Sequence, residues 1–90
     1  MTTLFPLGYT TATPHALDLL HAHSTSPATL LNRHAAGDWG QIDPEDRGLN
    51  ERALLDGDRV LSVYQVGTAC VWVITEADRS ATTLLLPEDY

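Results

Sequence analysis

The chain has 90 residues, of which 43% are hydrophobic, 7% aromatic and 19% charged, a composition that excludes a disordered chain. This length predicts a single domain, residues 1–90, with one thin core. The net charge of −7, from twelve acidic residues against five arginines and no lysine, argues against direct binding of nucleic acid, and no apolar run approaches the ~20 residues of a membrane span.

Three proline-marked helix starts organise the first two-thirds of the sequence. Each pairs a capping side chain with proline at the first helical position, where the missing N–H costs nothing: Thr13-Pro14, Ser26-Pro27 and Asp43-Pro44. The helices are expected to end near His21–His23, at Gly37 and at Asp56-Gly57. Their apolar faces are predicted to hold Leu17 with Leu20, then Leu30 with Leu31 and His34, then Leu49 with Ala53 and Leu54.

From Arg59 the hydrophobic period changes to two, which indicates β-strands. Strands are predicted over residues 60–66, 70–75 and 81–86, with a hairpin turn at Gly67-Thr68 and a second turn over residues 76–80. Such short links predict an antiparallel meander. Residues 8–12 are expected to add a short strand near the N-terminus.

The order of the elements predicts an α+β fold. Two or three short N-terminal helices would pack on one face of a three- to four-stranded antiparallel sheet. The core is predicted to draw on large apolar residues of both layers: Leu17, Leu20, Leu30, Leu31, Leu54, Val63, Val71, Val73 and Leu85.

The N-terminus, the cysteine and the histidines bear on compartment and cofactors. No basic residue precedes the apolar stretch of residues 1–6, so no secretory signal is expected. The single cysteine, Cys70, cannot form an internal disulfide, which fits the reducing cytoplasm. His15, His21 and His23 could supply nitrogen ligands to zinc, but their spacing is looser than zinc motifs require. We therefore predict no metal and no other cofactor.

Acidic residues concentrate between Asp38 and Asp58, where Arg47 and Arg52 are the only basic residues. The simpler interpretation is a solvated helix face with its caps. The functional interpretation is a surface that imitates phosphates or binds the Arg and Lys side chains of a partner. Its candidate partner-binding residues are Asp43, Glu45, Asp46, Glu51 and Asp56.

The segment Gly37-Asp38-Trp39-Gly40 predicts an irregular loop that holds a tryptophan. Trp39 either fills a gap between helices and sheet, with Asp38 hydrogen-bonded within the loop, or forms the floor of a site with His34 and Asp38. We expect the packing role, because a thin core with two tryptophans rarely leaves one outside.

Residues 75–83 combine a charged turn, an arginine and strand hydroxyls, which together can bind a small anion. If His34 and Arg59 reached the same face of the sheet, the set would resemble the parts of a metal-free ribonuclease: a general acid/base, cationic clamps and hydroxyl donors. The simpler interpretation is a turn in which Arg79 pairs with Glu76 or Asp78. The candidate catalytic residues are His34, Arg79, Thr82 and Thr83.

Several stretches carry a resemblance to a known family. They are Leu7-Gly8, Ala12-Thr13-Pro14, His34, the Gly-Asp-Trp-Gly of residues 37–40, Glu45-Asp46, Asn50, and residues 72–83 and 86–90. With these the sequence resembles small uncharacterised proteins carried by bacterial plasmids, integrative elements and phage-derived regions. The resemblance covers nearly the whole chain, although residues 67–70 replace the family's Gly-x-Lys hairpin tip. It implies a mobile-element setting and carries no activity.

A second resemblance is one of pattern. An upstream histidine followed by a late Arg-x-x-Thr, here His34, Arg79 and Thr82, is similar to the barnase/RelE-type ribonuclease toxins. Such toxins are usually basic, whereas this chain is acidic.

Three functional hypotheses follow. The leading one is a small acidic, non-enzymatic protein of a mobile element that binds a basic protein surface, such as a host nucleoprotein or nuclease complex. It would act as an inhibitor of the anti-CRISPR or anti-restriction type, or as a small regulator. The first alternative is a metal-free ribonuclease toxin that uses His34, Arg79 and Thr82. The second is a homo-oligomeric module, such as a homodimer, whose open sheet edges pair across a two-fold axis.

Overall fold

The chain forms an α+β fold in which three helices precede a three-stranded meander, as the sequence predicts. A computed structural model describes residues 3–90. The elements are β1 (Tyr9–Ala12), α1 (Pro14–Ala22), α2 (Pro27–Ala35), α3 (Pro44–Asp56), β2 (Val60–Val66), β3 (Ala69–Thr75), β4 (Ala81–Leu85) and a 3-10 turn, η1 (Pro87–Asp89). Met1 and Thr2, part of the stretch in which no secretory signal is expected, lie outside the described residues.

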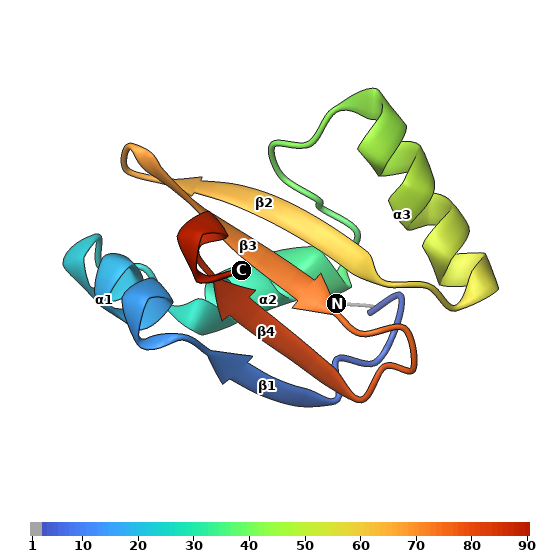
Figure 1. Ribbon diagram of the computed structural model, residues 1–90, viewed down its shortest axis with the longest axis horizontal. Helices are drawn as coiled ribbons and strands as arrows, with labels where there is room; N and C mark the ends of the chain where they lie inside the picture. Colours follow the sequence, from blue (N-terminus) through green and yellow to red (C-terminus); the bar gives the residue numbers. More distant parts are fainter. Residues whose placement is uncertain (1–2) are drawn as a thin grey trace.

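The four strands form one sheet in the order β1-β4-β3-β2 (Figure 1). β2, β3 and β4 form the predicted antiparallel meander. β1 pairs with β4 in parallel, so the sheet is mixed, whereas the sequence predicted antiparallel pairing alone. The parallel pair follows from the long helical connection between β1 and β2, which lets β2 run in the same direction as β1. Two antiparallel pairings later, β4 again runs in that direction.

The helix starts are built as predicted. Thr13 and Ser26 each accept a hydrogen bond from a first-turn amide at 3.2 Å, and Asp43 accepts one from Asp46 at 2.8 Å. Gly57 ends α3 in the left-handed conformation, with φ of 78°.

Helices α1 and α2 cover one face of the sheet, whereas α3 lies beside the edge strand β2 (Figure 1). The main hydrophobic core fills the space under α1 and α2, and consists of Ala16, Leu20, Leu30, Tyr64, Val66, Val71, Val73 and Leu84. On the opposite face, η1 lies against β3, and Tyr90 contacts Trp72 with 5.7 Å between ring centroids.

Most of the predicted core is confirmed, with one clear error. Leu20, Leu30, Val71, Val73 and Leu85 are buried, and Leu31, Leu54 and Val63 are partly buried. Leu17 is 45% exposed, because α1 turns Ala16 and Leu20 toward the sheet and leaves Leu17 on its flank.

Helix α3 is attached through a smaller cluster formed by Phe5, Trp39, Ala53 and Val60. Its inward side carries Asn50 and Ala53, and Leu54 is partly buried beside them. Ala53 and Leu54 are confirmed from the predicted stripe, whereas Leu49 is wrong, because it is 58% exposed. The Asn50 amide donates to the carbonyl of Leu61 at 2.6 Å and accepts from its N–H at 3.1 Å. A polar residue therefore faces inward because it pairs with the backbone of the edge strand.

The loop before α3 covers the next part of that edge. Val63 donates to the carbonyl of Trp39 at 3.0 Å and accepts from the N–H of Gln41 at 2.6 Å. Between them Gly40 has φ of 75°, and a side chain there would collide with the Val63 carbonyl. The outward backbone groups of Leu61 and Val63 on β2 are thus occupied by Asn50 and by residues 39–41.

Candidate functional site

The residues predicted for a ribonuclease site meet in part, in a buried hydrogen-bonded chain. The His34 side chain points from α2 onto strands β2 and β3 and is 0% exposed. Its Nδ1 lies 2.6 Å from the Ser62 hydroxyl and its Nε2 lies 2.9 Å from that of Thr75. Thr75 lies 2.7 Å from Thr82, which donates to the Leu7 carbonyl at 2.7 Å. We call these five groups the His34 chain.

The direction of the His34 chain follows from its last acceptor. A carbonyl can only accept a hydrogen bond, so the Thr82 hydroxyl donates its one proton to the Leu7 carbonyl. Thr75 must then donate to Thr82. Thr75 therefore accepts from Nε2–H of His34, and the unprotonated Nδ1 accepts from Ser62. Every hydrogen bond of the His34 chain is therefore made when the His34 ring is neutral and carries its proton on Nε2. Burial, with the nearby charge of Arg79, lowers the pKa of His34 to about 4.

Aromatic rings enclose the same histidine. Phe5 meets the His34 ring edge-on at 5.2 Å and Trp39 does so at 5.9 Å. Trp39 is 4% exposed, which confirms the packing role predicted for it. Asp38 does not join a site with these rings, because it points to the surface and accepts from Arg33 Nε at 2.6 Å and from the Gly40 N–H at 3.2 Å. Enclosed by these rings and by the hydroxyls of Ser62 and Thr75, the His34 side chain packs in the core and does not reach the surface.

Arg79 binds backbone carbonyls. Its guanidinium donates to the carbonyls of Asp58 at 2.6 Å, Ala53 at 2.9 Å and Glu76 at 3.2 Å. The expected alternative, pairing with the carboxylates of Glu76 or Asp78, is therefore wrong in detail. Ala53 lies in the last turn of α3, where the helix dipole favours a cation, and its carbonyl also accepts from the Gly57 N–H at 2.9 Å. Arg79 thus fastens the end of α3 to the β3–β4 turn.

The fourth candidate, Thr83, lies apart from the His34 chain. Successive strand residues face opposite sides, so Thr83 lies on the other face of the sheet from Thr82. There its hydroxyl lies 3.1 Å from that of Thr11. The predicted catalytic residues therefore lie in three places: His34 and Thr82 in the buried His34 chain, Arg79 at the end of α3, and Thr83 on the opposite face of the sheet.

Replacing Arg79 with alanine is expected to lower the free energy of unfolding by about 2 kcal/mol, because charge-assisted hydrogen bonds to three carbonyls are lost. Chemical denaturation measures this change. Arg59→Ala is the control and should cost less than about 1 kcal/mol, since both contacts of Arg59 lie at the surface: an ion pair with Glu76 at 3.8 Å and a hydrogen bond to the Tyr90 hydroxyl at 3.3 Å. Equal losses of unfolding free energy in the two variants would contradict the proposed attachment of α3 by Arg79.

Sequence reasoning missed Ser62 and Thr75, the two hydroxyls that hold the imidazole. Their signal was present in the period-two pattern. By alternation, Ser62 lies on the same face of the sheet as Val60 and Tyr64, and Thr75 lies on the same face as Val71 and Val73. Polar residues at inward positions require buried partners, and a histidine on the covering helix is one.

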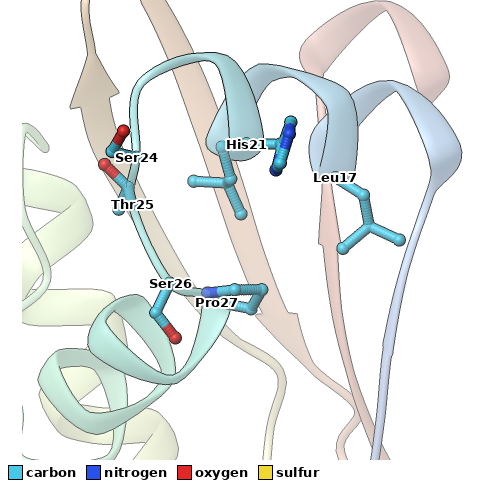
Figure 2. Close-up of a pocket in the computed structure, with 7 residues that line it drawn as sticks. Leu17, His21, Ser24, Thr25, Ser26 and Pro27 are labelled. Atoms are coloured by element: carbon cyan, nitrogen blue, oxygen red, sulfur yellow. The ribbon is translucent and has the colours of Figure 1, made fainter.

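The remaining histidines form no metal site. Among residues 3–90, no three His, Cys, Asp or Glu side chains lie close enough to hold an ion. His15 pairs with Asp89 at 2.7 Å, and this bond raises the pKa of His15. His21 lines a hollow of about 580 Å³ between α1 and the start of α2. Figure 2 shows Leu17 and His21 on α1, Ser24, Thr25 and Ser26 on the connection, and Pro27 at the start of α2.

The predicted acidic residues of α3 are all exposed, but they do not share one side of the helix. With about 3.6 residues per turn, Glu45 and Asp56 lie on the same side, about three turns apart. Glu51 lies farther round, Asp46 lies toward the sheet side, and Asp43 is the N-cap. The acids therefore surround α3.

Two exposed leucines lie beside Glu45 and Asp56. Leu49 is 58% exposed and Leu55 is 89% exposed. Helical spacing places Leu49 and Leu55 about 120° apart around α3, at the two borders of a side that also holds Glu45, Gly48, Arg52 and Asp56. Gly48 has open space where a side chain would be. We call this side the outward α3 face, and it consists of Glu45, Gly48, Leu49, Arg52, Leu55 and Asp56.

Comparisons with protein-family models, with curated proteins and with solved structures gave no significant match. The resemblance to mobile-element proteins therefore stays a prediction. In the part of the chain that the structure describes, no helix has the length and apolar character to cross a membrane.

Proposed function

We propose that the protein is a non-enzymatic interaction module that binds a basic protein surface through the outward α3 face. The observation that carries this proposal is the exposure of Leu49 and Leu55 between acidic side chains on a helix that buries only Asn50 and Ala53. Exposed apolar side chains on a helix are the kind of contact that a groove on a partner can bind.

The acids and the leucines have separate roles in this proposal. Glu45 and Asp56, with the other carboxylates around α3 and the net charge of −7, attract a basic partner over distance and accelerate association. Leu49 and Leu55 then supply the apolar contacts that slow dissociation. Arg52 lies between them and restricts the choice of partner, because it repels a uniformly basic groove at that point.

The resemblance to mobile-element proteins supports the class of partner. We propose a cytoplasmic host defence or regulatory machine, such as a CRISPR or restriction nuclease complex, whose nucleic-acid-binding surface is basic. The free thiol of Cys70 is compatible with that compartment. Inhibition would follow from occupying a surface that otherwise binds phosphates.

The buried position of His34 weighs against the ribonuclease alternative. A general base must come within about 3 Å of the proton it takes, and both ring nitrogens of His34 already hold hydroxyl partners in the core. Arg79 is likewise bound to carbonyls, so binding a phosphate there would release the end of α3.

The test is capture of partners by the tagged protein from lysates of cells that carry or lack CRISPR and restriction systems. We expect one stoichiometric partner that depends on such a system and whose association slows as salt is added. Leu49→Ala and Leu55→Ala should each weaken binding by at least about tenfold.

Two matched controls separate the outward α3 face from general acidity. Glu45→Gln with Asp56→Asn should weaken binding, whereas Asp18→Asn with Glu88→Gln, which removes the same charge elsewhere, should weaken it clearly less. Leu4→Ala, at another exposed leucine, should be neutral. Equal losses in both charge pairs, or the absence of any system-dependent partner, would contradict the proposal.

A further inference from the structure

The two edges of the sheet differ in a way that concerns self-association. At the β2 edge, Asn50 and residues 39–41 occupy the outward backbone groups of Leu61 and Val63. At the β1 edge, the register with β4 uses the backbone of Tyr9, Thr11 and Thr13. Alternation then turns the N–H and C=O of Thr10 and Ala12 outward, and among residues 3–90 no strand lies beyond them.

β1 is short, at four residues, but it carries no charged side chain or proline that would prevent another strand from pairing there. Soluble proteins protect open edges with charged residues, proline or bulges, and β1 is Tyr-Thr-Thr-Ala. Beneath the edge lies an apolar groove of about 240 Å³ that includes Ala12, Leu17, Pro27, Leu31 and Leu84. It shares Leu17 and Pro27 with the hollow of Figure 2, so the apolar surface continues from the edge toward the α1–α2 connection.

We propose that β1 is a dimerisation edge, at which the β1 strands of two copies pair antiparallel and form one continuous eight-stranded sheet. Charge favours a second copy as the occupant. β1 and the groove carry no charged side chain, while the acidic helix α3 lies beside the opposite edge of the sheet (Figure 1). Joined at β1, two chains of net charge −7 hold their acidic helices at the two far ends.

The outward backbone groups favour one register. Within β1 they belong to Thr10 and Ala12, and all of them are used when Thr10 of each copy pairs with Ala12 of the other and exchanges both hydrogen bonds. The two-fold axis then passes beside Thr11, which faces Thr11 of the second copy across a non-hydrogen-bonded position. The apolar grooves of the two copies meet beneath the joined sheet, where Leu17, 45% exposed in one chain, becomes covered.

Cysteine cross-linking tests this register directly, in a Cys70→Ser background. The Cα atoms of residue 11 would lie about 4.5 Å apart, within disulfide range, whereas those of residue 10 would lie about 8 Å apart, beyond it. We expect Thr11→Cys to give disulfide-linked dimers under mild oxidation, and Thr10→Cys, the neighbouring control, to give several-fold less. Equal cross-linking of the two variants, or more from Thr10→Cys, would overturn the proposal.

Mass in solution gives a second readout that does not depend on oxidation. Light scattering on the untagged wild-type chain should rise with concentration toward twice 9.8 kDa. Leu17→Arg should raise the dimer dissociation constant at least tenfold, and Leu4→Arg, at a similarly exposed leucine away from the groove, should leave it unchanged. A wild-type chain that remains a monomer at millimolar concentration would refute dimerisation and would leave the proposed role of α3 standing.

Discussion

Replacing Trp39 with alanine is expected to lower the free energy of unfolding by about 3–5 kcal/mol, the usual cost of truncating a buried tryptophan. The ring is 4% exposed, stacks on Phe5 at 6.2 Å and closes one side of the His34 ring. Domains of this size have a total stability of about 5–10 kcal/mol, so the variant should be close to unfolded at 37 °C. Urea denaturation at low temperature measures the change.

The other tryptophan provides the control. Trp72 is only partly buried, on the face of the sheet opposite α1 and α2, where it contacts Tyr90. Trp72→Ala should therefore lower the free energy of unfolding clearly less than Trp39→Ala. Trp39 also belongs to the cluster that attaches α3, together with Phe5 and Ala53. We therefore expect Trp39→Ala to increase hydrogen exchange in α3 more than in β3. Similar losses of stability in the two tryptophan variants would show that Trp39 is not a core anchor.

Acidification between pH 6.5 and pH 4 is expected to lower the free energy of unfolding by about 3 kcal/mol through His34 alone. The unfolded chain takes up a proton at the ordinary pKa of 6.5, whereas the native ring, with a pKa of about 4, stays neutral. Because the unfolded state binds more protons in this window, stability is full above pH 6.5 and is lost as the pH falls. Each pKa unit corresponds to about 1.4 kcal/mol.

The control is His34→Gln, whose amide can donate to Thr75 and accept from Ser62 without titrating. Its stability should vary much less across the same window. Asp38, Asp78 and Asp89 also have lowered pKa values, but their contributions are lost below about pH 4. His15 acts in the opposite direction, since its pKa is raised and its pairing with Asp89 is lost as the pH rises. An unchanged slope in His34→Gln would contradict the neutral buried tautomer.

Local signals in the sequence predicted the elements well and the long-range partners poorly. Thr13, Ser26 and Asp43 cap their helices through neighbouring amides, so a few residues of sequence contain all that is needed. The parallel pairing of β1 with β4 joins residues far apart in the chain, and nothing in Tyr-Thr-Thr-Ala specifies that partner or its direction.

The candidate site illustrates the same limit. The pattern His34, Arg79 and Thr82 resembles a catalytic set, and His34 and Thr82 do meet, with Thr75 between them. Whether such a cluster is open or buried depends on what covers it, here Phe5, Trp39 and α2. The exposure of Leu49 could not be predicted either, because Asn50 takes the inward position by pairing with the backbone of Leu61.

The most direct test of α3 as the functional surface is cross-linking in cells with a photoreactive amino acid at Leu55 or, separately, at Ala77. Both residues are exposed, and Ala77 lies in the turn that carries Arg79. We expect a discrete protein adduct from position 55 that disappears when Glu45→Gln and Asp56→Asn are added, and no such adduct from position 77. An RNA or protein adduct at position 77 with none at position 55 would contradict the proposed role of α3.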